Sequence, residues 1–126
     1  MVTKEAIDSL IMKLNLPEKD EFSQDWEYEV SDSKRLEEFI EFYQKNELTK
    51  DEKFTLMIII LESCDEAILK DELSEKIWSE VEEILINDKE IHEKTIDYWS
   101  WYDNENLEDC FYITPLVRKI SEKIKH

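Results

Sequence analysis

Hydrophobic residues along this chain recur mostly at the three- and four-residue spacing that places them on one face of a helix. The first stripe predicts a helix over residues 3 to 15, with Thr3 as its N-cap and Pro17 just beyond its end. The apolar members of this stripe are Ile7, Leu10, Ile11 and Leu14.

The helical pattern stops after Pro17, and DWEYEV at residues 25 to 30 has a different period. Trp26, Tyr28 and Val30 alternate there with acidic residues, which is typical of a strand or an extended segment whose aromatic side chains face inward. The sequence therefore predicts a short extended segment between the first two helices.

A second helix is predicted from Ser31 or Ser33 to about residue 46, and a third begins at Thr49. The pattern TKDE places Glu52 where its carboxylate can reach back to the cap nitrogen, as in a capping box. The run LMIIIL at residues 56 to 61 makes the third helix apolar on nearly every side. It should therefore be the central, buried helix.

Three further helices follow. We expect one to begin at Lys70 or Asp71, a shorter one to begin at Ile91 after a break, and the last to have Thr114 as its cap and Pro115 at its first position. Residues 100 to 110 have the composition of a loop. The predicted fold class is all-α: a compact bundle of five or six helices that forms a single domain over residues 1 to 126.

Glycine is absent from all 126 residues, and this excludes several function classes. Phosphate-cradling loops, dinucleotide-binding motifs and nucleophile elbows all depend on glycine. Cys64 and Cys110 form no CxxC pair, so neither a zinc knuckle nor a redox motif is indicated. Both are expected to be reduced and structural.

The chain has 33 acidic and 16 basic residues, which give a formal net charge of −17. Nucleic acids and anionic membranes bind cationic surfaces, so neither is an expected partner, whereas a basic protein is. No stretch approaches the roughly 18 apolar residues of a membrane span, and the N-terminus lacks a signal-peptide pattern. We therefore expect a soluble, cytoplasmic protein.

Candidate catalytic groups are few. His92 is the only internal histidine, and we interpret it as an exposed or helix-edge residue. The segment DNENLED at residues 103 to 109 spaces its oxygen atoms as a calcium loop does, but it lacks the turn glycine and has Thr114 at the twelfth position, where a bidentate glutamate should stand. The sequence predicts no enzyme, metal or cofactor.

The segment YWSWYDNENLED at residues 98 to 109, here called the acidic aromatic tract, combines four large rings with four carboxylates and no base. Trp99, with Phe111 and Ile113 beyond the tract, is expected to fill the core. The rings of YWSWY cannot all point one way, so some should be exposed, and exposed rings among carboxylates are typical of protein-binding surfaces. The candidate partner-binding residues are Tyr98, Trp101, Tyr102, Asp103, Glu105, Glu108 and Asp109.

A second acidic tract, residues 20 to 32, contains Phe22, Trp26 and Tyr28 and no basic residue. If the fold brings the two tracts together, they would form one continuous acidic and aromatic face.

In residues 25 to 63 and 98 to 120 the chain resembles the small acidic helical immunity proteins of bacterial polymorphic and contact-dependent toxin systems. The resemblance is one of overall style and carries no signature motif. It implies stoichiometric neutralisation, in which the protein binds a cognate toxin, often a nuclease with a basic substrate groove, and occludes its active site or a neighbouring site. Asp103, Glu105, Glu108 and Asp109 would then meet toxin lysines and arginines, and Trp101 would anchor the contact together with Tyr102.

Two other binding functions fit the same sequence: a regulatory or adaptor protein for another basic partner, and a nucleic-acid mimic. A mimic would bind several basic proteins with strong salt sensitivity, whereas an interface anchored by aromatic rings would keep much of its affinity in salt.

Overall fold

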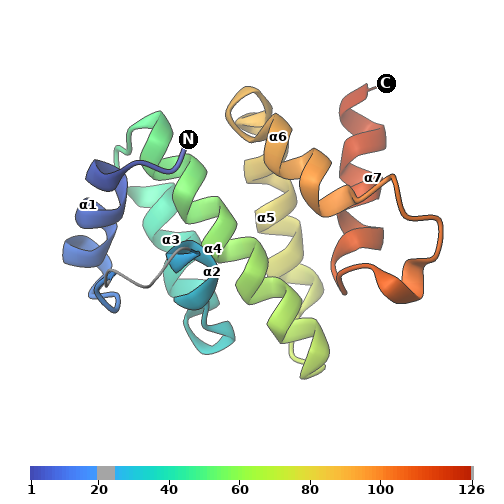
Figure 1. The fold of residues 1–126 in the computed structure, drawn as a ribbon, viewed down its shortest axis with the longest axis horizontal. Coiled ribbons are helices and arrows are strands. Elements are labelled where there is room, and N and C mark those ends of the chain that lie inside the picture. The colour runs from blue at the N-terminus through green and yellow to red at the C-terminus, as the bar shows by residue number, and fades with distance from the viewer. Residues whose placement is uncertain (20–24, 126) are drawn as a thin grey trace. The chain divides into compact units, whose positions relative to one another are not determined.

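A computed structural model describes residues 1–19 and 25–125. This part of the chain contains seven α-helices, two short 3-10 helices and no β-strand (Figure 1). The α-helices are α1 (Lys4–Leu14), α2 (Trp26–Glu29), α3 (Leu36–Lys45), α4 (Lys50–Leu69), α5 (Glu75–Asn87), α6 (Lys89–Ser100) and α7 (Thr114–Lys125). The 3-10 helices are η1 (Ser33–Arg35) and η2 (Leu107–Asp109). The all-α prediction is confirmed, with one or two helices more than expected.

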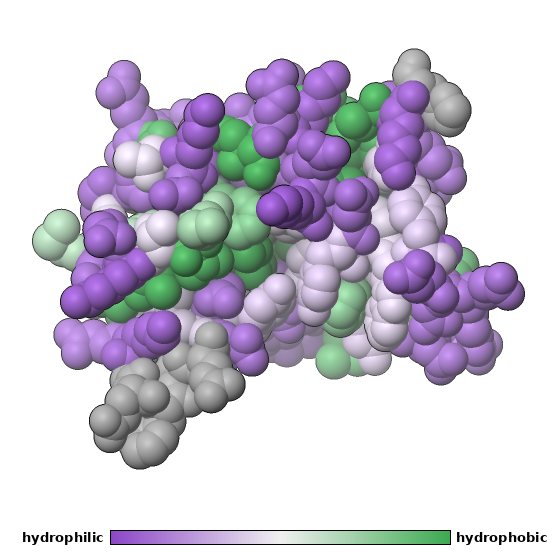
Figure 2. Space-filling model, turned by 45° about the horizontal axis from the view of Figure 1, so that its top comes forward, coloured by the Kyte–Doolittle hydropathy of each residue, from purple (hydrophilic) through white to green (hydrophobic). Residues whose placement is uncertain are grey.

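The chain divides into two compact units, Met1–Ser63 and Cys64–His126, and the boundary falls within α4. The single domain expected from the sequence stays a prediction, and each unit is described by itself. Hydrophilic side chains cover much of the face shown in Figure 2. Among the described helices, none is both long enough and apolar enough to cross a membrane.

In the first unit, α1 begins and ends close to where the sequence predicted. The Thr3 side chain accepts a hydrogen bond from the Ala6 N–H, and the helix ends at Asn15 in the left-handed region with φ of 52°. The guanidinium of Arg35 donates to the carbonyls of Leu14 and Asn15 and lies 5.1 Å from the centre of the Phe39 ring. Arg35 therefore satisfies carbonyl groups that a helix end leaves without partners.

Glu52 forms the predicted capping box and also ties α4 to α1. Its carboxylate accepts from the Thr49 N–H at 3.0 Å, and its own N–H donates to the Thr49 hydroxyl at 3.1 Å. The same carboxylate accepts from the Ser9 hydroxyl at 2.7 Å and from the Lys13 ammonium at 3.2 Å. Burial alone would raise the pKa of Glu52, but these hydrogen bonds outweigh it and lower the pKa to about 2.

The LMIIIL run of α4 is buried along its whole length, as the sequence predicted. Its six residues, Leu56 to Leu61, are all 7% exposed or less. Thr55 and Ser63 beside the run are also buried, and the Ser63 hydroxyl accepts from the Asp32 N–H and donates to the Ile59 carbonyl.

Residues 26 to 29 form the short helix α2, not the predicted extended segment. The Glu29 N–H donates to the Asp25 carbonyl and the Val30 N–H to the Trp26 carbonyl, which closes one helical turn. Trp26 and Val30 are both buried, and they are four residues apart. Because an alternating pattern of five residues also contains an i, i+4 pair, this short window fits a helical turn as well as a strand.

In the second unit, α5 begins at Glu75 with Ser74 as its N-cap, later than the predicted Lys70 or Asp71. Asp71 instead ends α4, with φ of 57°. The Glu72 N–H donates to the Ala67 carbonyl and the Asp71 N–H to the Ile68 carbonyl, a pair of bonds that defines a Schellman motif. Aspartate occupies here the position that glycine usually takes.

Helices α5, α6 and α7 pack against one another. Helix α7 begins at the predicted place, but the Thr114 side chain makes a different hydrogen bond from the predicted one. The Thr114 hydroxyl donates to the Trp99 carbonyl at 2.8 Å instead of capping α7. The carboxylate of Asp65 accepts from the Ile113 N–H at 3.0 Å, just before the first turn of α7. Burial raises the pKa of Asp65, and hydrogen bonds from the N–H groups of Ile113 and Tyr112 offset part of that effect.

Replacing the buried carboxylate in Glu52→Gln should destabilise the protein by roughly 2–3 kcal/mol at pH 7. A carboxyl group whose pKa falls from 4.5 in the unfolded chain to about 2 in the folded one stabilises the fold above pH 4.5 and loses that contribution as the pH falls toward 2. The stability difference between wild type and Glu52→Gln should therefore shrink over this range in urea denaturation. The control is Glu41→Gln, which removes an exposed pair with Lys45 and should cost about 0.5 kcal/mol or less. Equal losses in the two variants would contradict this role for Glu52.

Candidate protein-binding surface

The end of α6 separates the consecutive rings of YWSWY into buried and exposed ones. Trp99 is 1% exposed, whereas Tyr98, Trp101 and Tyr102 are 51%, 37% and 46% exposed. Neighbouring residues on a helix point about 100° apart, so Trp99 faces the core while Tyr98 faces outward. The expectation that some of these rings reach the surface is confirmed.

Phe111 joins the buried ring to the exposed ones. The centre of its ring lies 4.4 Å from that of Trp99, 5.6 Å from that of Tyr98 and 5.2 Å from that of Trp101. Tyr98 also meets Trp99 edge to face at 5.6 Å. Phe111 itself is half-buried, and Ile113 beyond it is fully buried. Tyr98 and Trp101 are therefore packed against the rings of Phe111 and Trp99.

Trp101 ends α6 in the left-handed region, with φ of 44°. Its N–H donates to the Asp97 carbonyl at 3.3 Å, which closes the last turn. A bulky residue at positive φ is strained, and such strain persists only where the surroundings hold it.

Arg118 of α7 supplies the contacts that hold this turn. Its Nε donates to the Ser100 carbonyl at 2.6 Å, and one terminal nitrogen donates to the Trp101 and Asn104 carbonyls at 2.7 and 2.9 Å. The guanidinium also lies 5.4 Å from the centre of the Tyr102 ring. The planar, multiply donating guanidinium suits this task, and the single ammonium of lysine would not.

Asparagine side chains shape the rest of the tract. Asn104 Oδ1 accepts from the Asn106 N–H, and Asn106 Oδ1 accepts from the Glu108 N–H and so caps η2. Asn106 Nδ2 donates to the Asp109 carboxylate at 3.2 Å. These bonds order the DNENLED segment without a glycine.

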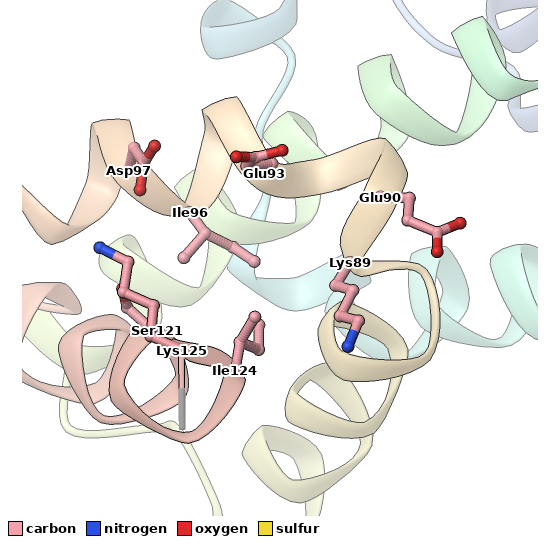
Figure 3. A pocket seen from close by; sticks show the side chains of 8 residues that line it. All are labelled: Lys89, Glu90, Glu93, Ile96, Asp97, Ser121, Ile124 and Lys125. Atoms are coloured by element: carbon pink, nitrogen blue, oxygen red, sulfur yellow. The ribbon is translucent and has the colours of Figure 1, made fainter.

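Seven residues surround a surface depression of about 590 Å³, here called the aromatic hollow. They are Asp97, Tyr98, Trp101, Tyr102, Asp103, Phe111 and Lys125. A second pocket of about 280 Å³ lies between α6 and α7 (Figure 3). It is adjacent to the aromatic hollow, since Asp97 and Lys125 line both. Ile96 and Ile124 supply the apolar lining of this second pocket, here called the neighbouring groove.

The structure brings only some of the candidate residues together. Tyr98, Trp101, Tyr102 and Asp103 line the aromatic hollow. Three candidates do not line it and are exposed on the loop that follows, namely Glu105, Glu108 and Asp109. Leu107 and Tyr112 are exposed in the same segment, at 48% and 54%, although the sequence had not singled them out.

The second acidic tract belongs to the first unit, and the continuous face expected from the two tracts stays a prediction. Trp26 is 1% exposed, and its indole N–H donates to the Pro17 carbonyl at 2.7 Å, so this ring belongs to the core of the first unit. Phe22 lies outside the described residues, and Tyr28 is half-buried.

His92 is fully buried on α6, not at the exposed or helix-edge position expected from the sequence. It lines neither of the two pockets. Over residues 1–19 and 25–125, no three His, Cys, Asp or Glu side chains are arranged to hold a metal ion. The carboxylates of DNENLED are exposed, and asparagine side chains within the segment accept hydrogen bonds from its backbone.

No protein-family model matches this chain, and neither the curated proteins nor the solved structures contain a match to it.

Two cations at the surface were missed by sequence reasoning. The acidic aromatic tract contains no base, but α7 brings Arg118 and Lys125 next to it. Arg118 binds backbone carbonyls of the tract, and both cations lie near the Tyr102 ring. The available signal was that Arg118 is one of only two arginines among 16 basic residues. Lysine suffices for a solvated surface, so a rare arginine indicates a position that needs the guanidinium fork.

Arg118→Lys should loosen the tract and expose Cys110, whose sulfur lies 3.9 Å from the Arg118 guanidinium. Loss of the carbonyl contacts should lower the local opening free energy by about 1.4 kcal/mol, so a disulfide reagent such as DTNB should modify Cys110 about tenfold faster. Cys64 will not interfere, because it is fully buried and burial raises the pKa of its thiol. Arg35→Lys, the equivalent change in the first unit, is the control and should leave the Cys110 rate unchanged. A Cys110 rate that is the same in Arg118→Lys and wild type would contradict the role of Arg118.

Trp101→Gly should be more stable than Trp101→Ala by about 0.5–1 kcal/mol in urea denaturation. Alanine retains the steric cost of the left-handed backbone, and this cost exceeds the extra entropy that glycine gains in the unfolded chain. Tyr102, whose φ is not positive, provides the control pair. There the order should reverse, with alanine more stable than glycine, and the same order at both positions would show that Trp101 is not strained.

Proposed function

We propose that this chain is an immunity protein, which neutralises a cognate toxin by stoichiometric occlusion through the acidic aromatic tract. The observation that carries the proposal is the exposure of Tyr98, Trp101 and Tyr102 around one hollow. Exposed aromatic rings supported by packed neighbours are the residues that dominate binding energy at protein interfaces.

The charge around these rings supports a basic partner. Asp97 and Asp103 line the aromatic hollow, and Glu105, Glu108 and Asp109 follow on the exposed loop. Carboxylates at the edge of an interface accelerate and orient the approach of a basic protein, while the rings supply most of the affinity. A nuclease toxin, with its cationic substrate groove, fits this arrangement.

The rings also separate this proposal from the nucleic-acid mimic. A mimic relies on carboxylates alone and loses its affinity as salt rises. Three exposed aromatic side chains beside Asp97 and Asp103 favour a partner-specific interface that persists in salt. An adaptor for a basic partner that is not a toxin would use the same surface, and toxicity of the partner distinguishes the two.

The variant Trp101→Ala, Asp103→Lys, Glu105→Lys should weaken binding to the partner by at least about 30-fold, since loss of one aromatic hot spot costs ~2 kcal/mol or more. The partner is first captured with wild-type protein from the native organism, then purified and measured by titration calorimetry. Expressed alone it should arrest growth, and co-expressed wild type, but not the variant, should restore growth.

The matched control is Tyr112→Ala, Glu47→Lys, Glu83→Lys, which removes an exposed ring and changes the net charge equally at exposed sites that do not line the aromatic hollow. It should bind and rescue as wild type does. A partner that is not toxic, or equal loss of binding in the two variants, would contradict the proposal.

A further inference from the structure

The aromatic hollow has the chemistry of a site for a single cationic side chain. Four rings line it: Tyr98, Trp101, Tyr102 and Phe111. Two carboxylates, Asp97 and Asp103, complete the lining together with Lys125. Ring faces attract cations, and adjacent carboxylates add direct charge attraction, so this combination favours an ammonium or guanidinium over a neutral or anionic group. A volume of about 590 Å³ is large enough for one long side chain.

The hollow already holds a cation that belongs to the chain itself. Lys125 Nζ lies 5.0 Å from the centre of the Tyr102 ring, within the range of a cation–π contact. Arg118 approaches the same ring at 5.4 Å, but its hydrogen bonds to three carbonyls fix it in place. Lys125 is exposed in the last turn of α7, and the last turn of a helix frays readily.

We propose that the aromatic hollow receives one lysine or arginine side chain of the partner protein, and that Lys125 is the intramolecular cation that this side chain displaces. The inference rests on the proposed function and names the chemical group that the surface recognises. Figure 3 shows Asp97 and Lys125 on the facing helices α6 and α7. Because Asp97 lines both pockets, the displaced Lys125 ammonium can stay beside a carboxylate in the neighbouring groove.

The displacement predicts competition between Lys125 and any cation that enters from outside. Removing Lys125 takes away the displaceable one of the two cations beside the Tyr102 ring, so an incoming cation no longer has to replace the Lys125 contact. An exposed cation–π contact corresponds to about a two- to fivefold change in affinity, and Lys125→Ala should strengthen binding of a cationic probe by that factor.

The probes are Nα-acetyl-arginine amide and Nα-acetyl-lysine amide, with the neutral isostere Nα-acetyl-citrulline amide as the control ligand. Binding is followed at constant ionic strength by nuclear magnetic resonance of the indole N–H groups. Trp101 is the one exposed tryptophan among the four, since Trp26, Trp78 and Trp99 are 9% exposed or less. The two cationic probes should shift the Trp101 signal saturably, and citrulline amide should not.

The matched control variant is Lys123→Ala, which removes the same charge from the same helix at a residue that pairs with Glu82 of α5 and does not line the aromatic hollow. It should leave the probe affinity as in wild type. Equal effects of Lys123→Ala and Lys125→Ala, or equal shifts by citrulline and arginine amides, would overturn the inference. Such a failure is distinct from failure of the proposed function, because the latter is decided by the toxicity and binding of the purified partner.

Discussion

A chain without glycine has to place other residues at the left-handed positions that end some of its helices, and the candidate surface depends on one of these positions. The left-handed residues that end helices are Asn15, Asp71 and Trp101, each at a position where glycine would carry no steric cost. Two of these ends are held by the only two arginines. Arg35 binds the last carbonyls of α1, and Arg118 binds those of α6. Each guanidinium also stacks on an aromatic ring, Phe39 or Tyr102.

The same constraint acts at the candidate surface. Trp101 is held at positive φ because Arg118 binds the carbonyls on both sides of the turn and Phe111 packs against the indole ring. Strain of this kind lowers stability, and its presence in an exposed ring supports the proposed binding role. A ring that is fixed before the partner arrives loses little conformational entropy on binding, and more of its contact energy appears as affinity.

Local signals in the sequence were sufficient where one element settles its own structure. The structure confirms the Thr3 cap, the Thr49–Glu52 capping box and the burial of the LMIIIL run. Each of these features is determined by residues close together in the sequence. Other features depend on partners distant in sequence or on a choice between two local patterns. These features are the start of α5, the turn at residues 26 to 29, the burial of His92 and the contacts of Arg118. Of the candidate site, the sequence yielded the exposed rings and carboxylates but not the cations that organise them.

The position of these cations changes how an excess of 33 acidic over 16 basic residues is to be understood. Net charge attracts basic proteins at long range but does not select among them. Selection requires a place where a partner's cation loses water and gains defined contacts in return, because a charge transferred without such contacts binds weakly. The aromatic hollow provides ring faces and two carboxylates in one place, and Lys125 already makes the contact that an incoming cation would make. The resident cation occupies a position beside the Tyr102 ring in the free protein, so an incoming cation has to be better placed to bind there. In the proposed function, the diffuse negative charge would govern approach, and the hollow would govern which approaching protein stays bound.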